Sequence, residues 1–156
     1  MEIDDIHIVG IDPSLSGTGL CFINKLNIPI TEIIKTKKMD NRFDRYDYIV
    51  HKILDFVPDT TNLVVIEHYS FGSIGKQTDL AELGGIIRYA LYVNKVKFIE
   101  VAPSSLKKFI TGRGNAKKDE MILAISKKYN KHFKDDNIAD AYALAQWGYT
   151  NAINHI

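Results

Sequence analysis

Short apolar runs and helical spacings of apolar residues alternate along this chain, which predicts a mixed α/β domain. The predicted strands cover residues 6–11, 20–23, 30–35, 63–66 and 96–101. The predicted helices cover residues 43–57, 79–94, a short segment after Pro103, 117–129 and 136–149. The first three strands form an antiparallel meander. The order of elements therefore predicts a single domain over residues 1–156, with a mixed five-stranded sheet flanked by helices.

Composition places the chain among ordinary globular proteins, with 46% hydrophobic and 25% charged residues. No apolar run reaches the roughly 18 residues that a transmembrane helix needs, so we expect no membrane association. The first five residues are acidic rather than basic, which argues against a signal peptide. The single cysteine, Cys21, cannot form an intrachain disulfide. These features favour a reducing, cytoplasmic setting.

The formal net charge of +1 hides a strong asymmetry along the chain. Residues 101–134 hold nine lysine or arginine residues and two acidic ones, so this segment carries +7 and the remainder −6. A basic segment beside an acidic remainder indicates a surface that binds a polyanion such as nucleic acid. The alternative is a solvated helical surface with no binding role.

Four acidic residues occupy positions suited to metal binding: Asp12, Glu67, Asp136 and Asp140. Asp12 and Glu67 each end an apolar run that predicts a buried strand, and carboxylates there are costly unless a cation meets them. Asp136 and Asp140 are four residues apart, so they share one face of a helix. The alternatives are a turn-forming aspartate at Asp12, a solvated strand end at Glu67, and a helix cap or dipole partner at Asp135 or Asp136.

Two adjacent glycines, Gly84 and Gly85, lie inside the predicted helix 79–94. Each costs about 1 kcal/mol relative to alanine in a helix. A close approach of another element to the helix would explain why they are tolerated, and we expect one here.

The acidic motifs are similar to those of RuvC-type Holliday junction resolvases, which belong to the RNase H-like superfamily. The resemblance lies in Gly-Ile-Asp-Pro-Ser at 10–14, Val-Val-Ile-Glu at 64–67 and Asp-Asn-Ile-Ala-Asp-Ala at 136–141. The basic stretches 102–108 and 111–118 also resemble that family. The resemblance covers nearly the whole chain and implies an RNase H-like fold. The short length is more typical of a phage or viral member, which would act in the host cytoplasm.

The resemblance implies roles for particular residues. It makes Asp12, Glu67, Asp136 and Asp140 the catalytic metal ligands. Many relatives carry the last two acids three apart rather than four, so Asn137 is an alternative ligand to Asp136. The implied nucleic-acid-binding residues are Lys107, Lys108, Arg113, Lys117, Lys118, and an aromatic residue that is either Tyr69 or Phe71.

The chemistry implied is a metal-dependent endonuclease that cuts four-way DNA junctions by paired symmetric nicks, leaving a 5′-phosphate and a 3′-hydroxyl. Oxygen ligands without a Cys/His cluster select Mg²⁺, with Mn²⁺ as a substitute, and two ions per site are the usual arrangement for cutting phosphodiesters. Two symmetric cuts imply a C2 homodimer. We expect the helix with Gly84 and Gly85 to form part of its interface.

Three other interpretations remain open. The same scaffold could serve a flap or branched-DNA nuclease or an RNA-processing nuclease, with the same acids. The chain could instead be a junction-binding module without catalysis, although such a module would need none of the four acids. An actin-like ATPase would share the first aspartate, but 156 residues are too few for its two lobes.

Overall fold

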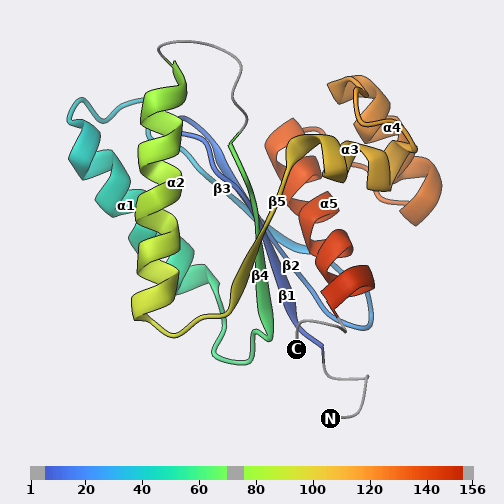
Figure 1. The fold of residues 1–156 in the computed structure, drawn as a ribbon, viewed down its shortest axis with the longest axis horizontal. Helices are drawn as coiled ribbons and strands as arrows, with labels where there is room; N and C mark the ends of the chain where they lie inside the picture. The colour runs from blue at the N-terminus through green and yellow to red at the C-terminus, as the bar shows by residue number, and fades with distance from the viewer. Residues whose placement is uncertain (1–5, 70–75, 153–156) are drawn as a thin grey trace.

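The computed structural model describes residues 6–69 and 76–152 and contains a five-stranded sheet with helices on both faces (Figure 1). The strands are β1 (Ile8–Asp12), β2 (Thr18–Ile23), β3 (Ile30–Ile34), β4 (Leu63–Glu67) and β5 (Phe98–Val101). The helices are α1 (Arg42–Phe56), α2 (Lys76–Val93), α3 (Pro103–Thr111), α4 (Lys118–Tyr129) and α5 (Asp136–Asn151). The predicted order of elements is confirmed, and the predicted boundaries hold to within three residues.

The strand order is β3-β2-β1-β4-β5, and it brings the ends of four strands to one edge. The pairs β1–β2 and β2–β3 are antiparallel, whereas β1–β4 and β4–β5 are parallel. The predicted antiparallel meander is therefore confirmed. Strands β1, β3, β4 and β5 all run in the same direction, so their carboxyl ends lie together. Figure 1 shows this edge at the top of the view.

The two faces of the sheet bury separate hydrophobic clusters, because side chains along a strand alternate between faces. On β1, Val9 and Ile11 pack toward α1 and α2, while Ile8 packs toward α5. On β4, Val64 and Ile66 take the first face and Val65 the second. By the same alternation, the residues that end β1 and β4 both face α5. This places Asp12 and Glu67 on one side of the sheet.

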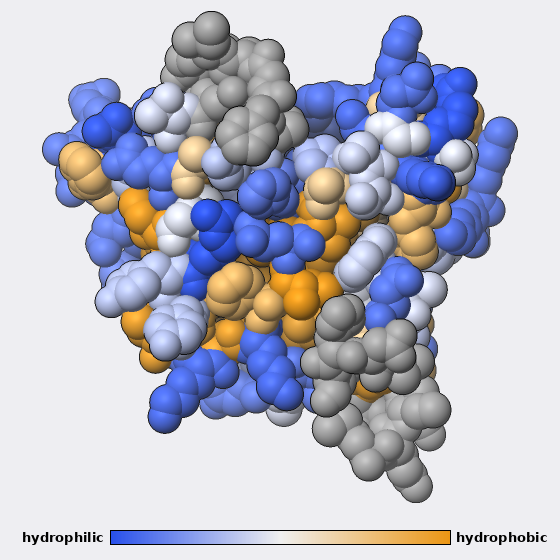
Figure 2. All heavy atoms as spheres, viewed as in Figure 1, coloured by the Kyte–Doolittle hydropathy of each residue, from blue (hydrophilic) through white to orange (hydrophobic). Residues whose placement is uncertain are grey.

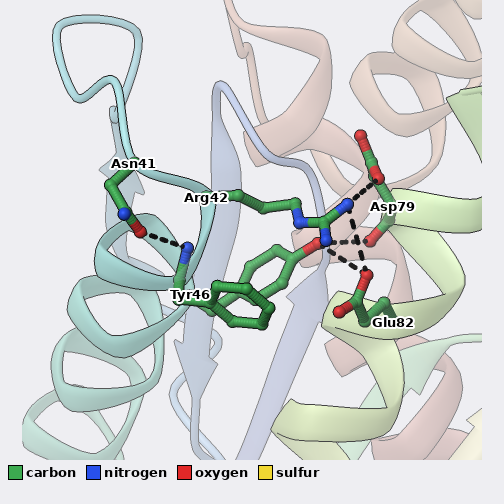
Figure 3. Close-up of polar contacts among 6 residues, drawn as sticks. Asn41, Arg42, Tyr46, Asp79 and Glu82 are labelled. Carbon is green, nitrogen blue, oxygen red and sulfur yellow. Dashed lines mark hydrogen bonds and ion pairs between the residues drawn. The ribbon is translucent and has the colours of Figure 1, made fainter.

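Helices α1 and α2 are joined by a polar network near their N-terminal ends (Figure 3). The Tyr46 ring is buried, and its hydroxyl lies 3.3 Å from Glu82 Oε2. Burial, with the Glu82 carboxylate beside it, raises the pKa of this tyrosine. Arg42 contacts Asp79 at 3.2 Å, and Asn41 caps the first turn of α1. The network fixes α1, which in turn supports the loop that precedes it.

Helix α5 packs directly on the backbone of β1 and β2, because glycines there leave room for it. A Cβ atom on Gly10 would lie 2.0 Å from the Ala141 carbonyl oxygen, and one on Gly19 would lie 2.2 Å from the Asn137 carbonyl oxygen. Such distances are impossible for real Cβ atoms, so both positions require glycine. This contact carries Asp140, the neighbour of Ala141, to the carboxyl end of β1.

Within the described residues of one chain, no second element approaches Gly84 or Gly85 as expected. A Cβ on Gly84 would meet Arg88 Nη1 at 3.5 Å and one on Gly85 would meet Arg88 Nη2 at 3.8 Å, and no atom of another described element lies within 4 Å of either. Both contacts are of ordinary length. The two glycines give room to the Arg88 side chain of their own helix rather than to a second element.

We predict opposite effects for alanine at these two kinds of glycine. Gly10→Ala should lower the free energy of unfolding by about 3 kcal/mol or more, because α5 must move off the sheet. Gly84→Ala is the matched control and should be neutral or stabilising by up to about 1 kcal/mol, since alanine favours helix. Urea denaturation measures both. Equal stability of the two variants would contradict the close packing of α5 on β1.

Candidate metal-dependent active site

Three carboxyl groups from three elements act on one another at the carboxyl edge of the sheet. Asp12 is the last residue of β1, Glu67 is the last of β4, and Asp140 lies one turn inside α5. Desolvation by burial, followed by repulsion from Glu67 and Asp140, raises the pKa of Asp12 well above its usual value. Burial and the charge of Asp140 raise the pKa of Glu67 to about 7. The pKa of Asp140 is raised to about 6 for the same reasons, with Asp136 as its neighbour.

Asp136 differs from the other three acids, because a lysine neutralises it. Lys118 Nζ donates to Asp136 Oδ2 at 2.5 Å, and this bond holds the pKa of Asp136 below its usual value. Asp136 is also the most exposed of the four, with about a third of its side chain accessible. Asp135, not Asp136, caps the helix: its Oδ1 accepts from the Asn137 and Ile138 amides. The alternative of a helix cap or dipole partner at Asp135 or Asp136 is therefore confirmed, with Asp135 as the cap and Asp136 in the first turn.

Asn137, the alternative ligand, lies on the β1–β2 turn side of α5. A Cβ on Gly17 would lie 3.2 Å from the Asn137 side-chain nitrogen. Asn137 lines a groove there together with Ser16 and Lys35. The choice between Asp136 and Asn137 stays a prediction.

The carboxylates do not form a ready-made metal cluster. Across residues 6–69 and 76–152, no three His, Cys, Asp or Glu side chains are grouped closely enough to hold a metal ion. The arrangement nevertheless suits a divalent ion, since the donors are all oxygens and three of them carry charge that protein cations leave largely unbalanced.

The predicted basic residues lie on α3, α4 and the turn between these helices. Lys107 lowers the pKa values of Glu67 and Asp140 against the dominant effect of burial, so its ammonium is near the carboxylates. Arg113 pairs with Glu120 at 2.7 Å, and the Lys117 amide donates to the same glutamate. Figure 2 shows hydrophilic side chains gathered over the α3–α4 side of the molecule, at the upper right.

Tyr69 and Phe71 follow Glu67, but only Tyr69 lies within the described residues. Its ring stacks at a tilt on His68, with centroids 5.0 Å apart. Tyr69 also lines a small hollow with Pro13 and Glu67, beside the carboxylates. The His68 ring nitrogen Nδ1 lies 2.9 Å from Glu100 Oε1, which Arg88 contacts at 2.7 Å. These contacts, from Arg88 on α2 through Glu100 on β5 to His68, hold the residue after Glu67, and the sequence alone does not predict them.

Comparison with known proteins decides the family. A family model described as "Crossover junction endodeoxyribonuclease RuvC" matches residues 8–147. This chain belongs to the RuvC family. RuvC of Brachyspira hyodysenteriae is 31% identical over 143 residues, which is 88% of this chain and 89% of that protein. RuvC of Prochlorococcus marinus strain MIT 9312 is 29% identical over 90% of this chain and 94% of that protein.

Solved RuvC structures have the same fold. Thermus thermophilus RuvC superimposes with a TM-score of 0.74 at 20% identity, over 96% of this chain and 95% of that one. The structure of T. thermophilus RuvC in complex with Holliday junction substrate gives a TM-score of 0.76 at 20% identity, over 96% and 94%. The predicted RNase H-like sheet is thereby confirmed. The phage or viral origin stays a prediction.

Among the helices in the described part of the chain, none has the length and apolar character needed to span a bilayer.

Proposed function

We propose that this RuvC-family chain is a metal-dependent endonuclease that cuts four-way DNA junctions in the cytoplasm by paired symmetric nicks, leaving 5′-phosphate and 3′-hydroxyl ends. The observation that carries the proposal is the set of three carboxyl groups on β1, β4 and α5, with Asp12 buried and Glu67 and Asp140 half-buried, whose pKa values are raised by desolvation and by neighbouring carboxylates. A fold has no structural need for such a costly arrangement. The family's endonuclease activity explains it.

The site would hold two Mg²⁺ ions, with Mn²⁺ as a substitute. Asp12, Asp136 and Asp140 would bind one ion, and Asp12 and Glu67 the other. Divalent ions at such a site supply positive charge to the phosphate and to the attacking and leaving oxygens. Lys118 donates to Asp136 Oδ2 in the structure, so Asp136 would bind an ion through Oδ1 or by exchanging that partner. Asn137 is the substitute ligand if it does not.

The protein's own residues would orient the DNA around these ions. Lys107 is close enough to affect Glu67 and Asp140 electrostatically, so it can contact the phosphate that is cut. Lys108, Arg113, Lys117 and Lys118 would bind neighbouring phosphates without reading bases, so affinity should fall steeply with salt. Tyr69, or Phe71, would stack on an unpaired base, which is worth about 1–3 kcal/mol.

A C2 homodimer would place two such sites on one junction, and α2 offers a surface for it. The buried face of α2 carries Leu83, Ile87 and Leu91. On another face, Tyr89 and Tyr92 have relative exposures of 68% and 72%. Exposed aromatic side chains on one helix are typical of protein interfaces.

We predict that the double substitution Tyr89→Arg and Tyr92→Arg gives a monomer, because buried like charges would meet across the two-fold axis. Sedimentation velocity measures the assembly, and a supercoiled plasmid with an extruded cruciform measures coupled cutting. Wild type should linearise the plasmid, whereas the variant should give mainly nicked circles. Tyr48→Arg on α1, where Tyr48 is 40% exposed, is the control. If the double variant remained a dimer, the interface would have to lie on another surface of the protein.

The test of function is cleavage of an immobile four-way junction with Mg²⁺ or Mn²⁺, beside flap, fork, duplex and RNA hairpin substrates. Paired symmetric nicks on the junction, absent with Asp140→Asn, are expected. Equal or faster cutting of flaps or RNA would instead indicate a branched-DNA or RNA-processing nuclease with the same site. Tight junction binding without cutting under either metal would indicate a non-catalytic binding module.

A further inference from the structure

The order of strands places basic residues on both sides of the carboxylates. Asp12 and Glu67 end the inner strands β1 and β4. The outer strand β5 leads at the same edge into α3, with Lys107 and Lys108. The other outer strand, β3, leads at that edge into residues 35–38, Lys-Thr-Lys-Lys. We call this segment the 35–38 loop. It lies on the opposite side of the carboxylates from the α3–α4 surface.

The 35–38 loop borders a groove of about 510 Å³ whose wall includes Asn137, the residue next to Asp136. The opposite wall consists of the turn after Asp12 and the first turn of α5. The residues that line it are Ser16, Gly17, Ile33, Lys35, Thr36, Lys37, Lys38, Met39, Asp135 and Asn137. Asp135 is the one acidic side chain among them, and it is engaged as the cap of α5.

The loop is held rigidly at its centre. The Thr36 side chain is buried, and its hydroxyl donates to the Leu15 carbonyl oxygen in the turn after Asp12. Arg45 of α1 donates to both groups, at 3.0 Å to Thr36 Oγ1 and at 2.9 Å to the Leu15 oxygen. Helix α1 is itself anchored to α2 (Figure 3). The loop is therefore preorganised against the turn that leaves the active-site strand.

The three lysines of the loop are exposed, and none of them forms an ion pair within the described residues. This contrasts with the α3–α4 surface, where Arg113 pairs with Glu120 and Lys118 with Asp136. Three like charges on four residues repel one another and contribute nothing to folding. A rigid loop that presents them beside a groove is suited to binding phosphates.

We propose that Lys35, Lys37 and Lys38 form a second phosphate-binding surface, which holds the sugar-phosphate backbone of the DNA on the β3 side of the carboxylates. The inference rests on the proposed function. With both surfaces occupied, the backbone would cross the carboxylates between two basic supports. The groove would set the direction in which the DNA leaves the site.

The first test is junction binding by the triple variant Lys35→Gln, Lys37→Gln and Lys38→Gln. Affinity at 0.1 M salt should fall by about tenfold or more, and the slope of log affinity against log salt should become shallower by about 2 to 3, because each phosphate contact contributes about 0.9. The control is Lys25→Gln, Lys95→Gln and Lys97→Gln, which removes the same charge from the far end of the sheet. The inference fails if both triple variants change binding equally.

A second test uses single cysteines, because Cys21 is fully buried and will not react with a label. Lys37→Cys, carrying a photo-crosslinking group, should crosslink to junction DNA at positions distinct from those reached by Lys108→Cys. Lys25→Cys should not crosslink. Absence of crosslinks from Lys37→Cys, with crosslinks from Lys108→Cys, would overturn the inference.

The two proposals fail in distinguishable ways. If the wild-type protein neither binds nor cuts branched DNA, the proposed function itself is wrong. If the wild type cuts junctions and the triple variant binds and cuts them as the control does, the function stands and the second surface is wrong. Circular dichroism and thermal unfolding establish that the triple variant is folded.

Discussion

Asp12→Asn is expected to slow junction cutting by about a thousandfold or more while leaving junction affinity within a few fold of wild type. Asparagine keeps the shape of the side chain but removes the charge that two divalent ions would share. A loss of about 4 kcal/mol of transition-state stabilisation corresponds to this factor, and metal ions contribute several kcal/mol of this kind. Single-turnover cleavage with Mg²⁺ and gel-shift binding with EDTA measure the two quantities.

Asp12 is the most informative of the four acids for this experiment. The residue is only 8% exposed, so Asp12 is not an ordinary solvated surface charge. Its pKa responds to Glu67, Asp140 and Asp136, so it lies at the centre of the group. Asp55→Asn, on the exposed C-terminal part of α1, removes the same charge and should cut at the wild-type rate. Loss of binding by folded Asp12→Asn, or cutting at the rate of the control, would refute the assignment.

The sequence was sufficient to predict which elements form and where two of the acids lie. Short apolar runs ending in Asp12 and Glu67 predict buried strands that end in carboxylates, and β1 and β4 are such strands. Alternation along each strand then fixes the face on which both side chains lie. Strand starts are less certain from the pattern. β1 begins at Ile8 rather than Ile6, because its pairing with β4 begins where Ile8 meets Leu63.

Contacts between distant residues could not be predicted in this way. The bond from Lys118 to Asp136 spans 18 positions, and the Thr36–Leu15–Arg45 contacts join three separate segments. The Lys-Thr-Lys-Lys run was a visible signal for a basic loop, but only the strand order places it beside the carboxylates. Gly10 also carried a signal, because glycine inside a strand often marks a close approach. From the sequence alone, the close approach is instead expected at the helical pair Gly84–Gly85.

The raised carboxyl pKa values have a consequence for stability that is separate from cutting. Glu67 has a pKa of about 7 in the folded protein and 4.5 as its ordinary value. Between these pH values the folded state binds more protons than the unfolded state, so stability falls as pH rises. The contribution of Glu67 to the free energy of unfolding is therefore fully present below about pH 4.5 and is lost as pH rises through 7. The same sign holds for Asp140, whose pKa rises to about 6.

We therefore predict that Glu67→Gln abolishes cutting yet stabilises the metal-free protein at pH 8. The gain should approach an upper limit of about 3 kcal/mol, since each pKa unit corresponds to about 1.36 kcal/mol. It should vanish below about pH 4.5, where the Glu67 carboxyl is neutral in the folded and the unfolded protein alike. Urea denaturation in EDTA across this pH range measures it, with Asp55→Asn as the control that shows no such trend.

Added Mg²⁺ separates a metal site from carboxylates that are merely buried. A bound divalent ion neutralises the repulsion, so Mg²⁺ should stabilise the wild-type protein strongly at pH 8 and little at pH 5, where protons compete for the same oxygens. Glu67→Gln should gain less from Mg²⁺ at pH 8, because one ion would lose a ligand.

If Mg²⁺ stabilised both proteins equally, or if Glu67→Gln destabilised the protein at pH 8, the carboxylates would be balanced by other groups. Loss of cutting in that variant would then need a structural explanation. A substitution that stabilises the metal-free protein and also abolishes cutting would show that these carboxylates lower stability and are needed for catalysis.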